Sequence, residues 1–205
     1  MIHLLFQLCL LVAYPACKKS GSDNPVNPVI PTTPFFVKGA DISWLTEMES
    51  AGIKFYNASG TQTEGMQLLK SIGLNTIRLR VWVNPTDGWC NKADVLAKAT
   101  RAKNLGMKIL INFHYSDTWA DPGNQTKPAA WAAMNIAGLE DAVYTHTADV
   151  MNALKTNGIT PDWVQVGNET NNGMLWPEGK ASINMDYYAR FFKAGYNAVK
   201  AVSPT

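Results

Sequence analysis

The stretch N-T-I-R-L-R-V-W-V, residues 75–83, decides the fold. Its odd positions from 77 to 83 are Ile, Leu, Val and Val, and its even positions from 78 to 82 are Arg, Arg and Trp. Because side chains alternate between the two faces of a strand, one face is apolar and the other carries two cations. The apolar face suits packing under helices, and the polar face suits the lumen of a barrel. An open doubly wound sheet would need both faces apolar.

Two other apolar segments alternate in the same way and become polar toward their C-terminal ends. The segment M-K-I-L-I-N-F-H-Y, residues 107–115, ends near His114, and D-W-V-Q-V-G-N-E, residues 162–169, ends at Glu169. In (βα)₈ barrels the active site collects at the C-terminal ends of the strands. We therefore expect these polar ends to meet at one site.

Helical patterns separate the expected strands, which predicts parallel βα units. The predicted fold class is α/β, a (βα)₈ TIM-barrel type. A full barrel takes about 250 residues, or roughly 200 at the smallest. Residues 35–205 hold about the first four units, so we expect them to be the N-terminal half of a barrel. The predicted strands are 35–44, 75–83, 107–115 and 162–169, and the predicted helices are 63–73, 93–105, 139–156 and 184–202.

Composition narrows the class of protein. The 205 residues are 46% hydrophobic and 17% charged, with a formal net charge of +2. These values are typical of a soluble globular protein, and no cluster of Lys and Arg suggests nucleic acid as a partner. We expect a monomer.

The N-terminal residues indicate export. An apolar run from Leu4 to Ala13 is too short to span a bilayer but has the length of a secretory signal. The sequence Y-P-A-C resembles a bacterial lipoprotein cleavage site, so we expect a signal peptide at 1–16 and a lipidated Cys17. The alternative is an ordinary signal peptide with an incidental cysteine. Residues 17–34 are rich in proline and predict a disordered tether. The expected location is the periplasm or the cell surface, with the membrane contacted only through the lipid.

Neither a disulfide framework nor a metal centre is expected. Without the leader only Cys17 and Cys90 remain, and His114 has no second histidine nearby at ligand spacing. No cofactor is expected in this chain, and calcium is left open for the other half of the barrel.

Glu169 is the strongest candidate for catalysis. A carboxylate at a buried strand end is costly to keep ionised, as a general acid requires. Asn168 beside it offers an amide to a substrate hydroxyl. The alternative is a structural ion pair between Glu169 and an inward arginine. For His114, the alternative is a hydrogen-bonded structural residue.

Tryptophans occur at strand ends or in the loops that follow them, rather than in mid-helix, which favours stacking on sugar rings over filling the core. They are Trp44, Trp82, Trp119 and Trp176.

Four stretches together resemble glycoside hydrolase family 53, the endo-β-1,4-galactanases. They are G-A-D-I-S-W (39–44), R-L-R-V-W-V-N-P (78–85), H-Y-S-D-T-W-A-D-P with K-P (114–122, 127–128), and G-N-E-T-N-N-G-M-L-W-P (167–177). The resemblance covers nearly all of residues 35–205 and implies a (βα)₈ barrel that hydrolyses β-1,4-galactan with retention.

The resemblance also implies roles for individual residues. Glu169 would be the acid/base, Asn168 would contact the sugar 2-hydroxyl, and Arg80 would lie near the nucleophile. The residues expected to line the cleft are Asp41, Trp44, His114, Trp119 and Trp176. The family's nucleophile is a Glu on the seventh strand, so we expect the 205-residue chain alone to be inactive and to fold poorly.

Two alternatives stay open. The first is a galactan-binding lipoprotein without activity, in which the tryptophans hold the glycan. The second is a barrel glycosidase that acts on another β-glycan.

Overall fold

Four parallel strands form the main sheet of the described residues, in the order β1–β4–β5–β6. The protein is seen as a computed structural model that describes residues 35–204. The expected signal peptide, lipidated Cys17 and tether lie outside these residues and stay predictions. The strands are β1 (Gly39–Asp41), β4 (Thr76–Val81), β5 (Lys108–Phe113) and β6 (Trp163–Val166).

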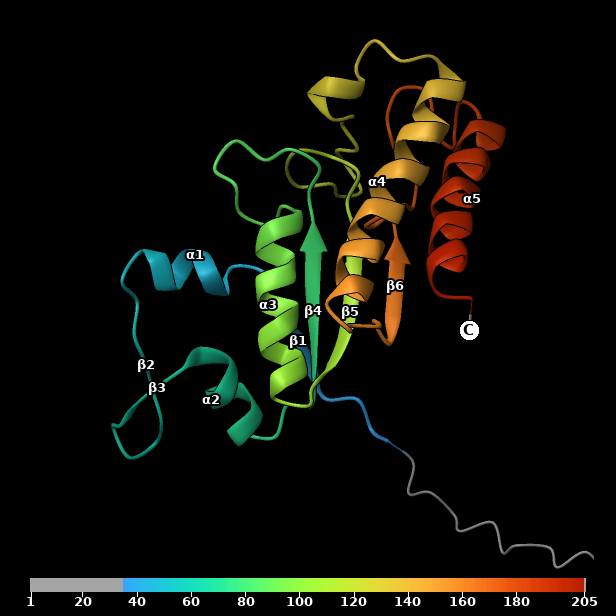
Figure 1. Ribbon diagram of the computed structural model, residues 1–205. Helices are drawn as coiled ribbons and strands as arrows, with labels where there is room; N and C mark the ends of the chain where they lie inside the picture. Colours follow the sequence, from blue (N-terminus) through green and yellow to red (C-terminus); the bar gives the residue numbers. More distant parts are fainter. Residues whose placement is uncertain (1–34, 205) are drawn as a thin grey trace, which may run out of the picture. The chain divides into compact units, whose positions relative to one another are not determined.

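Helices follow the strands, which confirms the predicted βα units. Figure 1 shows α3 and α4 lying across one face of the sheet, with α5 beside β6. An asparagine side chain caps the N-terminus of each of these three helices by accepting a backbone N–H, as such caps commonly do. The helices are α2 (Gly65–Ser71), α3 (Lys92–Asn104), α4 (Ile136–Thr156) and α5 (Met185–Val202).

The core lies between the sheet and these helices. Ile77, Leu79 and Val81 of β4 are fully buried, as are Ile111 and Phe113 of β5. The alternate positions of both strands carry polar side chains on the opposite face, apart from Leu110 of β5. The period-of-two prediction for these strands is therefore confirmed.

All four strands are shorter than predicted, and the difference is largest for β1 and β6, where the chain turns as the polar residues begin. After β1, the backbone N–H of Ser43 binds the Asp41 carboxylate, which turns the chain out of the sheet. After β6, Gly167 has a φ of 85° and Glu169 a φ of 48°, and neither value fits an extended strand.

Four short elements were not predicted from the sequence. They lie in segments without clear periodicity and take their shape from packing against the units. They are α1 (Leu45–Ser50), β2 (Phe55–Tyr56), β3 (Gln62–Thr63) and the 3₁₀ helix η1 (Ala129–Trp131).

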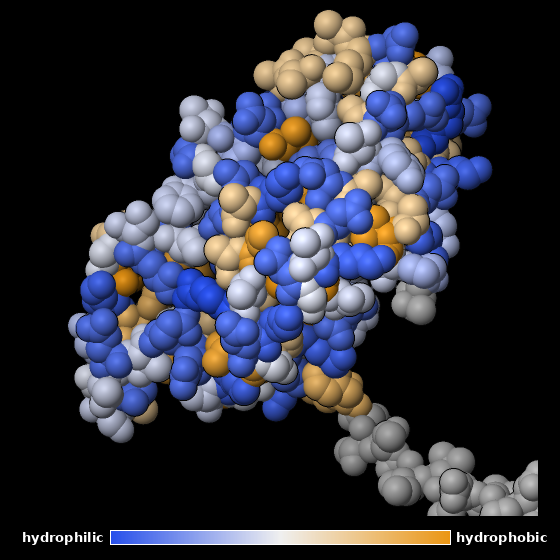
Figure 2. Space-filling model, viewed as in Figure 1, coloured by the Kyte–Doolittle hydropathy of each residue, from blue (hydrophilic) through white to orange (hydrophobic). Residues whose placement is uncertain are grey.

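Hydrophilic residues cover most of the surface over α3 and α4, with small separate hydrophobic areas between them (Figure 2). Across residues 35–204, no helix is both long enough and apolar enough to cross a membrane.

Candidate active site

The side chain of Arg78 connects the C-terminal end of β1 with the residues that follow β6. One nitrogen, Nη1, lies 2.6 Å from the Asp41 carboxylate, and Nη2 donates to Asn168 Oδ1 at 2.7 Å. Burial raises the pKa of Asp41, but hydrogen bonds from Ser43 and Arg78 outweigh it and hold the pKa below its ordinary value. Asp41 is thus an ionised partner that holds Arg78 across the lumen face.

Asn168 is held on three sides. Its Oδ1 accepts hydrogen bonds from Arg78 and from Asn112 Nδ2 at 2.9 Å, and its Nδ2 donates to Ala120 O at 2.7 Å. An amide nitrogen carries two hydrogens. One N–H of Asn168 therefore stays available to a ligand, in an orientation that the protein fixes.

Arg80, two residues after Arg78, lies among aromatic rings instead. Its guanidinium carbon is 4.2 Å from the ring centroid of Trp119, 4.7 Å from that of Trp44 and 4.9 Å from that of Trp82. The side chain is 2% exposed, and among the described residues neither Nε nor Nη2 has a hydrogen-bond acceptor. A buried cation with free donors is costly, and an anionic or hydroxyl-rich ligand would satisfy it.

His114 is a neutral donor beside these rings. Its Nδ1 accepts from the indole N–H of Trp82 at 3.3 Å and from the backbone N–H of Ala120 at 3.2 Å, which assigns the ring proton to Nε2. Burial, together with the charges of Arg78 and Arg80, lowers the pKa of His114 to about 3. The Nε2–H has no acceptor within residues 35–204.

Glu169 lies just past β6 and is exposed. The expectation of a buried carboxylate at a strand end is wrong for this chain, because the turn at Gly167 carries Glu169 beyond the sheet. Within the described residues its carboxylate makes no hydrogen bond, so it can reach a ligand. The alternative of an ion pair between Glu169 and Arg78 or Arg80 is not what the structure shows, since both arginines pair with Asp41.

The tryptophans differ in exposure. Trp44 is 51% and Trp119 41% exposed, whereas Trp82 is 7% exposed and packs beneath Trp119. Trp44 and Trp119 meet edge to face with centroids 5.7 Å apart. Trp176 lies in the loop between β6 and α5. There its indole N–H donates to Asn172 O, and Lys180 Nζ lies 4.5 Å from its ring centroid.

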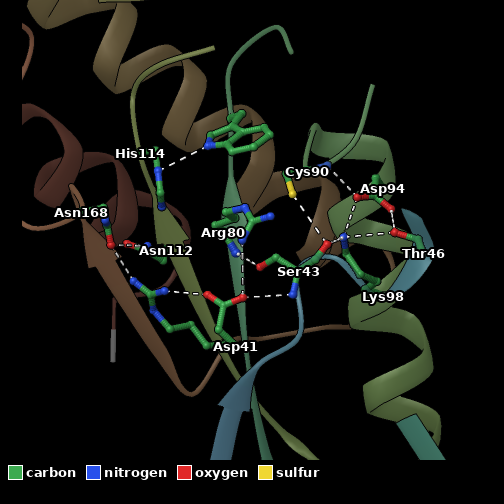
Figure 3. A network of polar contacts seen from close by, with 12 residues as sticks. Asp41, Ser43, Thr46, Arg80, Cys90, Asp94, Lys98, Asn112, His114 and Asn168 are labelled. Carbon is green, nitrogen blue, oxygen red and sulfur yellow. Dashed lines mark hydrogen bonds and ion pairs between the residues drawn. The ribbon is translucent and has the colours of Figure 1, made fainter. Parts of the chain in front are cut away.

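A buried network supports the end of β1 from the helix side (Figure 3). Lys98 of α3 is fully buried and donates to the backbone oxygen of Ser43 at 2.6 Å and to Asp94 at 2.5 Å. Ser43 in turn accepts the backbone N–H of Arg80 at 2.8 Å through its hydroxyl. The network fixes the turn after β1 against the end of β4.

The structure brings most of the predicted site residues together. We use the name strand-end cluster for five of them, which touch one another through ring contacts and ion pairs: Asp41, Trp44, Arg80, His114 and Trp119. Asn168 is connected to this cluster through Arg78, and Glu169 directly follows Asn168 in the chain. Trp176 is tied to the β5–α4 loop instead, where its backbone N–H donates to Gln125 O.

Sequence reasoning missed the supporting residues Ser43, Lys98 and Gln125. None has a spacing that signals its role, because each acts through a contact between distant segments. Asn112 had a signal, since its parity places it on the polar face of β5. No group of three or more His, Cys, Asp or Glu side chains in residues 35–204 is arranged to hold a metal ion.

Comparison with known proteins gives consistent matches. Residues 37–205 match the model of Glycosyl hydrolase family 53. A probable arabinogalactan endo-β-1,4-galactanase A of Aspergillus fumigatus is 46% identical over 144 residues, which are 70% of this chain and 40% of that protein. The solved catalytic domain of an Ignisphaera aggregans family 53 enzyme superposes with a TM-score of 0.79 at 39% identity, over 87% of this chain and 51% of the other.

A structure from work on two fungal β-1,4-galactanases gives a TM-score of 0.77 at 42% identity, over 80% of this chain and 49% of the other. The chain thus spans about half the length of the relatives it matches. The superposition confirms the TIM-barrel type of fold, with four of its βα units in the described residues. The match to the family model extends from just before β1 to the last residue of the chain, and the chain belongs to glycosyl hydrolase family 53.

Proposed function

We propose that the protein is an exported endo-β-1,4-galactanase that hydrolyses the β-1,4-galactan of type I arabinogalactan with retention. The observation that carries this proposal is an exposed Glu169 immediately after Asn168, in a chain of family 53. Arg78 and Asp41 link this Asn168 to the strand-end cluster, which contains the exposed Trp44 and Trp119. Two of the relatives are named as arabinogalactan endo-β-1,4-galactanases.

In the proposed reaction Glu169 donates its proton to the glycosidic oxygen while a second carboxylate attacks the anomeric carbon. The leaving sugar departs with that proton, and a glycosyl-enzyme ester remains. Glu169, now a carboxylate, takes a proton from water, and the resulting hydroxide displaces the enzyme carboxylate. Each turnover consumes one water and restores both groups.

The surrounding residues would hold the sugar. The free amide N–H of Asn168 and the Nε2–H of His114 are fixed donors for ring hydroxyls. Trp44 and Trp119 offer exposed flat apolar faces, with the half-buried Trp176 proposed as a further wall, and the unpaired donors of Arg80 suit the ionised nucleophile.

We further propose that the nucleophile comes from the half of the barrel that residues 35–204 do not contain. Support comes from the chain spanning about half the length of its relatives and from Asp41 being engaged by Arg78 and Ser43. The proposal also includes export with a lipid on Cys17, a monomer, no cofactor and no nucleic-acid partner. Radiolabelled palmitate incorporation into wild type and not into Cys17→Ala would test the lipid.

The test of the activity uses the longest protein that the gene encodes around residues 35–204, assayed on β-1,4-galactan and, in parallel, on mannan and cellulose. Glu169→Ala should lower kcat by about 10²- to 10⁴-fold. On an aryl galactobioside with a good leaving group, azide should restore turnover of that variant and form a galactobiosyl azide, because azide attacks without needing a base. Glu47→Gln, another carboxylate without a side-chain hydrogen bond among the described residues, is the control.

Galactan cleavage that persists in Glu169→Ala would overturn the assigned role. A wild-type protein that binds galactan without cutting it would instead be the binding lipoprotein, and cleavage of mannan or cellulose alone would change the substrate.

A further inference from the structure

Glu169 has a backbone conformation that needs support. Its φ of 48° lies in the left-handed region, which is unfavourable for a residue with a side chain. The backbone of Asn168 and Glu169 sets the direction in which the Glu169 side chain leaves the chain, so whatever holds the peptide between them limits where the carboxylate can reach.

The side chain that holds this peptide is Gln125, from the β5–α4 loop (residues 114–135). Its Nε2 donates to Asn168 O at 2.8 Å and to Asp121 O at 3.1 Å, with Glu169 O at the limit of a hydrogen bond at 3.5 Å. All three partners are carbonyl oxygens, so the nitrogen and not the oxygen of the amide must face them. No other described side chain donates to the carbonyl of Asn168.

Gln125 is itself fixed from several sides. It is 2% exposed, and its backbone oxygen accepts the N–H of Trp176 at 2.8 Å. The turn that precedes it is closed because the Asp121 carboxylate accepts the backbone N–H groups of Gly123 and Asn124. A buried, anchored amide therefore connects the β5–α4 loop to the β6–α5 loop (residues 167–184) at the peptide between Asn168 and Glu169.

We infer that Gln125 is a positioning residue that aims the Glu169 carboxyl at the glycosidic oxygen. This inference rests on the proposed function, because it gives Gln125 a part in proton donation through Glu169. Proton transfer requires a heavy-atom distance of about 2.6–3.2 Å, and a displacement of about 1 Å costs on the order of 10²-fold in rate. Loss of the Gln125 amide should therefore impair protonation of the leaving group more than binding of the sugar.

The experiment uses Gln125→Met, which keeps the length of the side chain and removes both donors, in the longest protein that the gene encodes. Two galactobiosides are compared by kcat/KM: a 2,4-dinitrophenyl one, whose phenolate leaves without a proton, and a methyl one, whose alcohol must be protonated. The control is Gln67→Met, an exposed glutamine on α2 whose side chain makes no hydrogen bond to a described residue.

We expect Gln125→Met to lose about 10- to 100-fold on the methyl substrate and less than about threefold on the dinitrophenyl substrate, with little change in KM. Gln125→Glu, which turns an ionised acceptor toward the carbonyls, should show the same selectivity with a larger loss. Equal losses on both substrates, or no loss, would overturn the inference and leave the proposed function standing. A wild-type protein inactive on both substrates would overturn the proposed function itself.

Amide hydrogen exchange gives a second readout that does not need activity. In Gln125→Met the backbone amides of 169–173 should exchange faster, while those of β4 and β5 stay protected. Unchanged exchange at 169–173 would also overturn the inference.

Discussion

The strand-end cluster and the β6–α5 loop hold their functional groups in different ways. Arg80 lies in β4 and His114 directly follows β5, and they are 2% and 1% exposed. The buried network of Lys98 supports the backbone of Arg80 through Ser43. Glu169 is exposed, departs from strand geometry and depends on contacts between two loops. The groups proposed to bind a sugar thus lie in or next to the sheet, whereas the proposed proton donor lies on a loop held by a contact with another loop. The two regions should be separable by mutation.

The largest expected effect comes from Lys98→Met, which removes the support of the strand-end cluster. Asp94, whose side chain is 9% exposed, loses its ion-pair partner and keeps only the hydrogen bonds from Thr46 and Cys90, and the Ser43 carbonyl loses a donor. Breaking a buried ion pair costs about 3–5 kcal/mol in the free energy of unfolding, measured by urea denaturation.

Lys92→Met provides the matched control. The Lys92–Asp149 pair is 46% and 54% exposed, so its loss should cost less than about 1 kcal/mol. Equal losses in the two variants would contradict the importance of the buried network.

The second largest effect is expected from Gly173→Ala, which should destabilise the β6–α5 loop and leave the rest of the fold unchanged. In Gly173→Ala the added Cβ would lie 1.9 Å from the backbone oxygen of Gly179, at a φ of 84°. Local destabilisation of about 2–3 kcal/mol is expected, seen as faster proteolysis of the loop while β4 and β5 stay protected from hydrogen exchange.

Gly60→Ala separates strain from collision. Gly60 has a φ of 75°, but nothing lies within 4 Å of its added Cβ. A Gly173→Ala protein no more sensitive to protease than Gly60→Ala would show that the tight contact with Gly179 does not hold the loop.

Two histidines should make stability depend on pH: His114 on the lumen face of the sheet and His146 on the helix side. Burial is the main cause that lowers the pKa of His114 to about 3 and that of His146, in α4, to about 4. The unfolded chain binds protons as the pH falls below about 6.5, and the folded chain does not. The contribution of the two neutral histidines to the free energy of unfolding is therefore fully present above pH 6.5. It is lost as the pH falls toward 4 for His146 and toward 3 for His114.

Each imidazole should lower the free energy of unfolding by about 2 kcal/mol between pH 7 and pH 5, measured by denaturation at both values. His114→Gln and His146→Phe should each remove about half of this dependence. A wild-type stability that is the same at pH 5 and pH 7 would refute the assignment.

The smallest effect is expected from Lys127→Met, which breaks the Lys127–Glu178 pair between the two loops. The pair is partly buried, at 10% and 28% exposed, so about 1 kcal/mol is expected by chemical denaturation. Its loss should loosen the β6–α5 loop and leave the strand-end cluster unchanged. A loss as large as that of Lys98→Met would mean that the two regions do not differ in their support.

Sequence reasoning predicted the first region well and the second poorly. A period of two along 75–83 places Arg78 and Arg80 on the lumen face, because strand geometry leaves no other choice. The exposure of Glu169 follows from the turn at Gly167, and the contact of Gln125 with Asn168 joins residues 43 positions apart. No local pattern encodes such a contact between loops, so only the folded chain reveals it.

The tryptophans around Arg80 have an optical consequence. Trp44 and Trp82 each lie within 6 Å of Trp119, centroid to centroid, in near-perpendicular pairs. Indoles this close couple their electronic transitions, so the three rings should give a circular-dichroism couplet that isolated indoles lack. The three tryptophans thus form an intrinsic chromophore at the C-terminal edge of the sheet. Binding of a sugar that displaces Trp44 or Trp119 should change this couplet, so binding could be measured without a label.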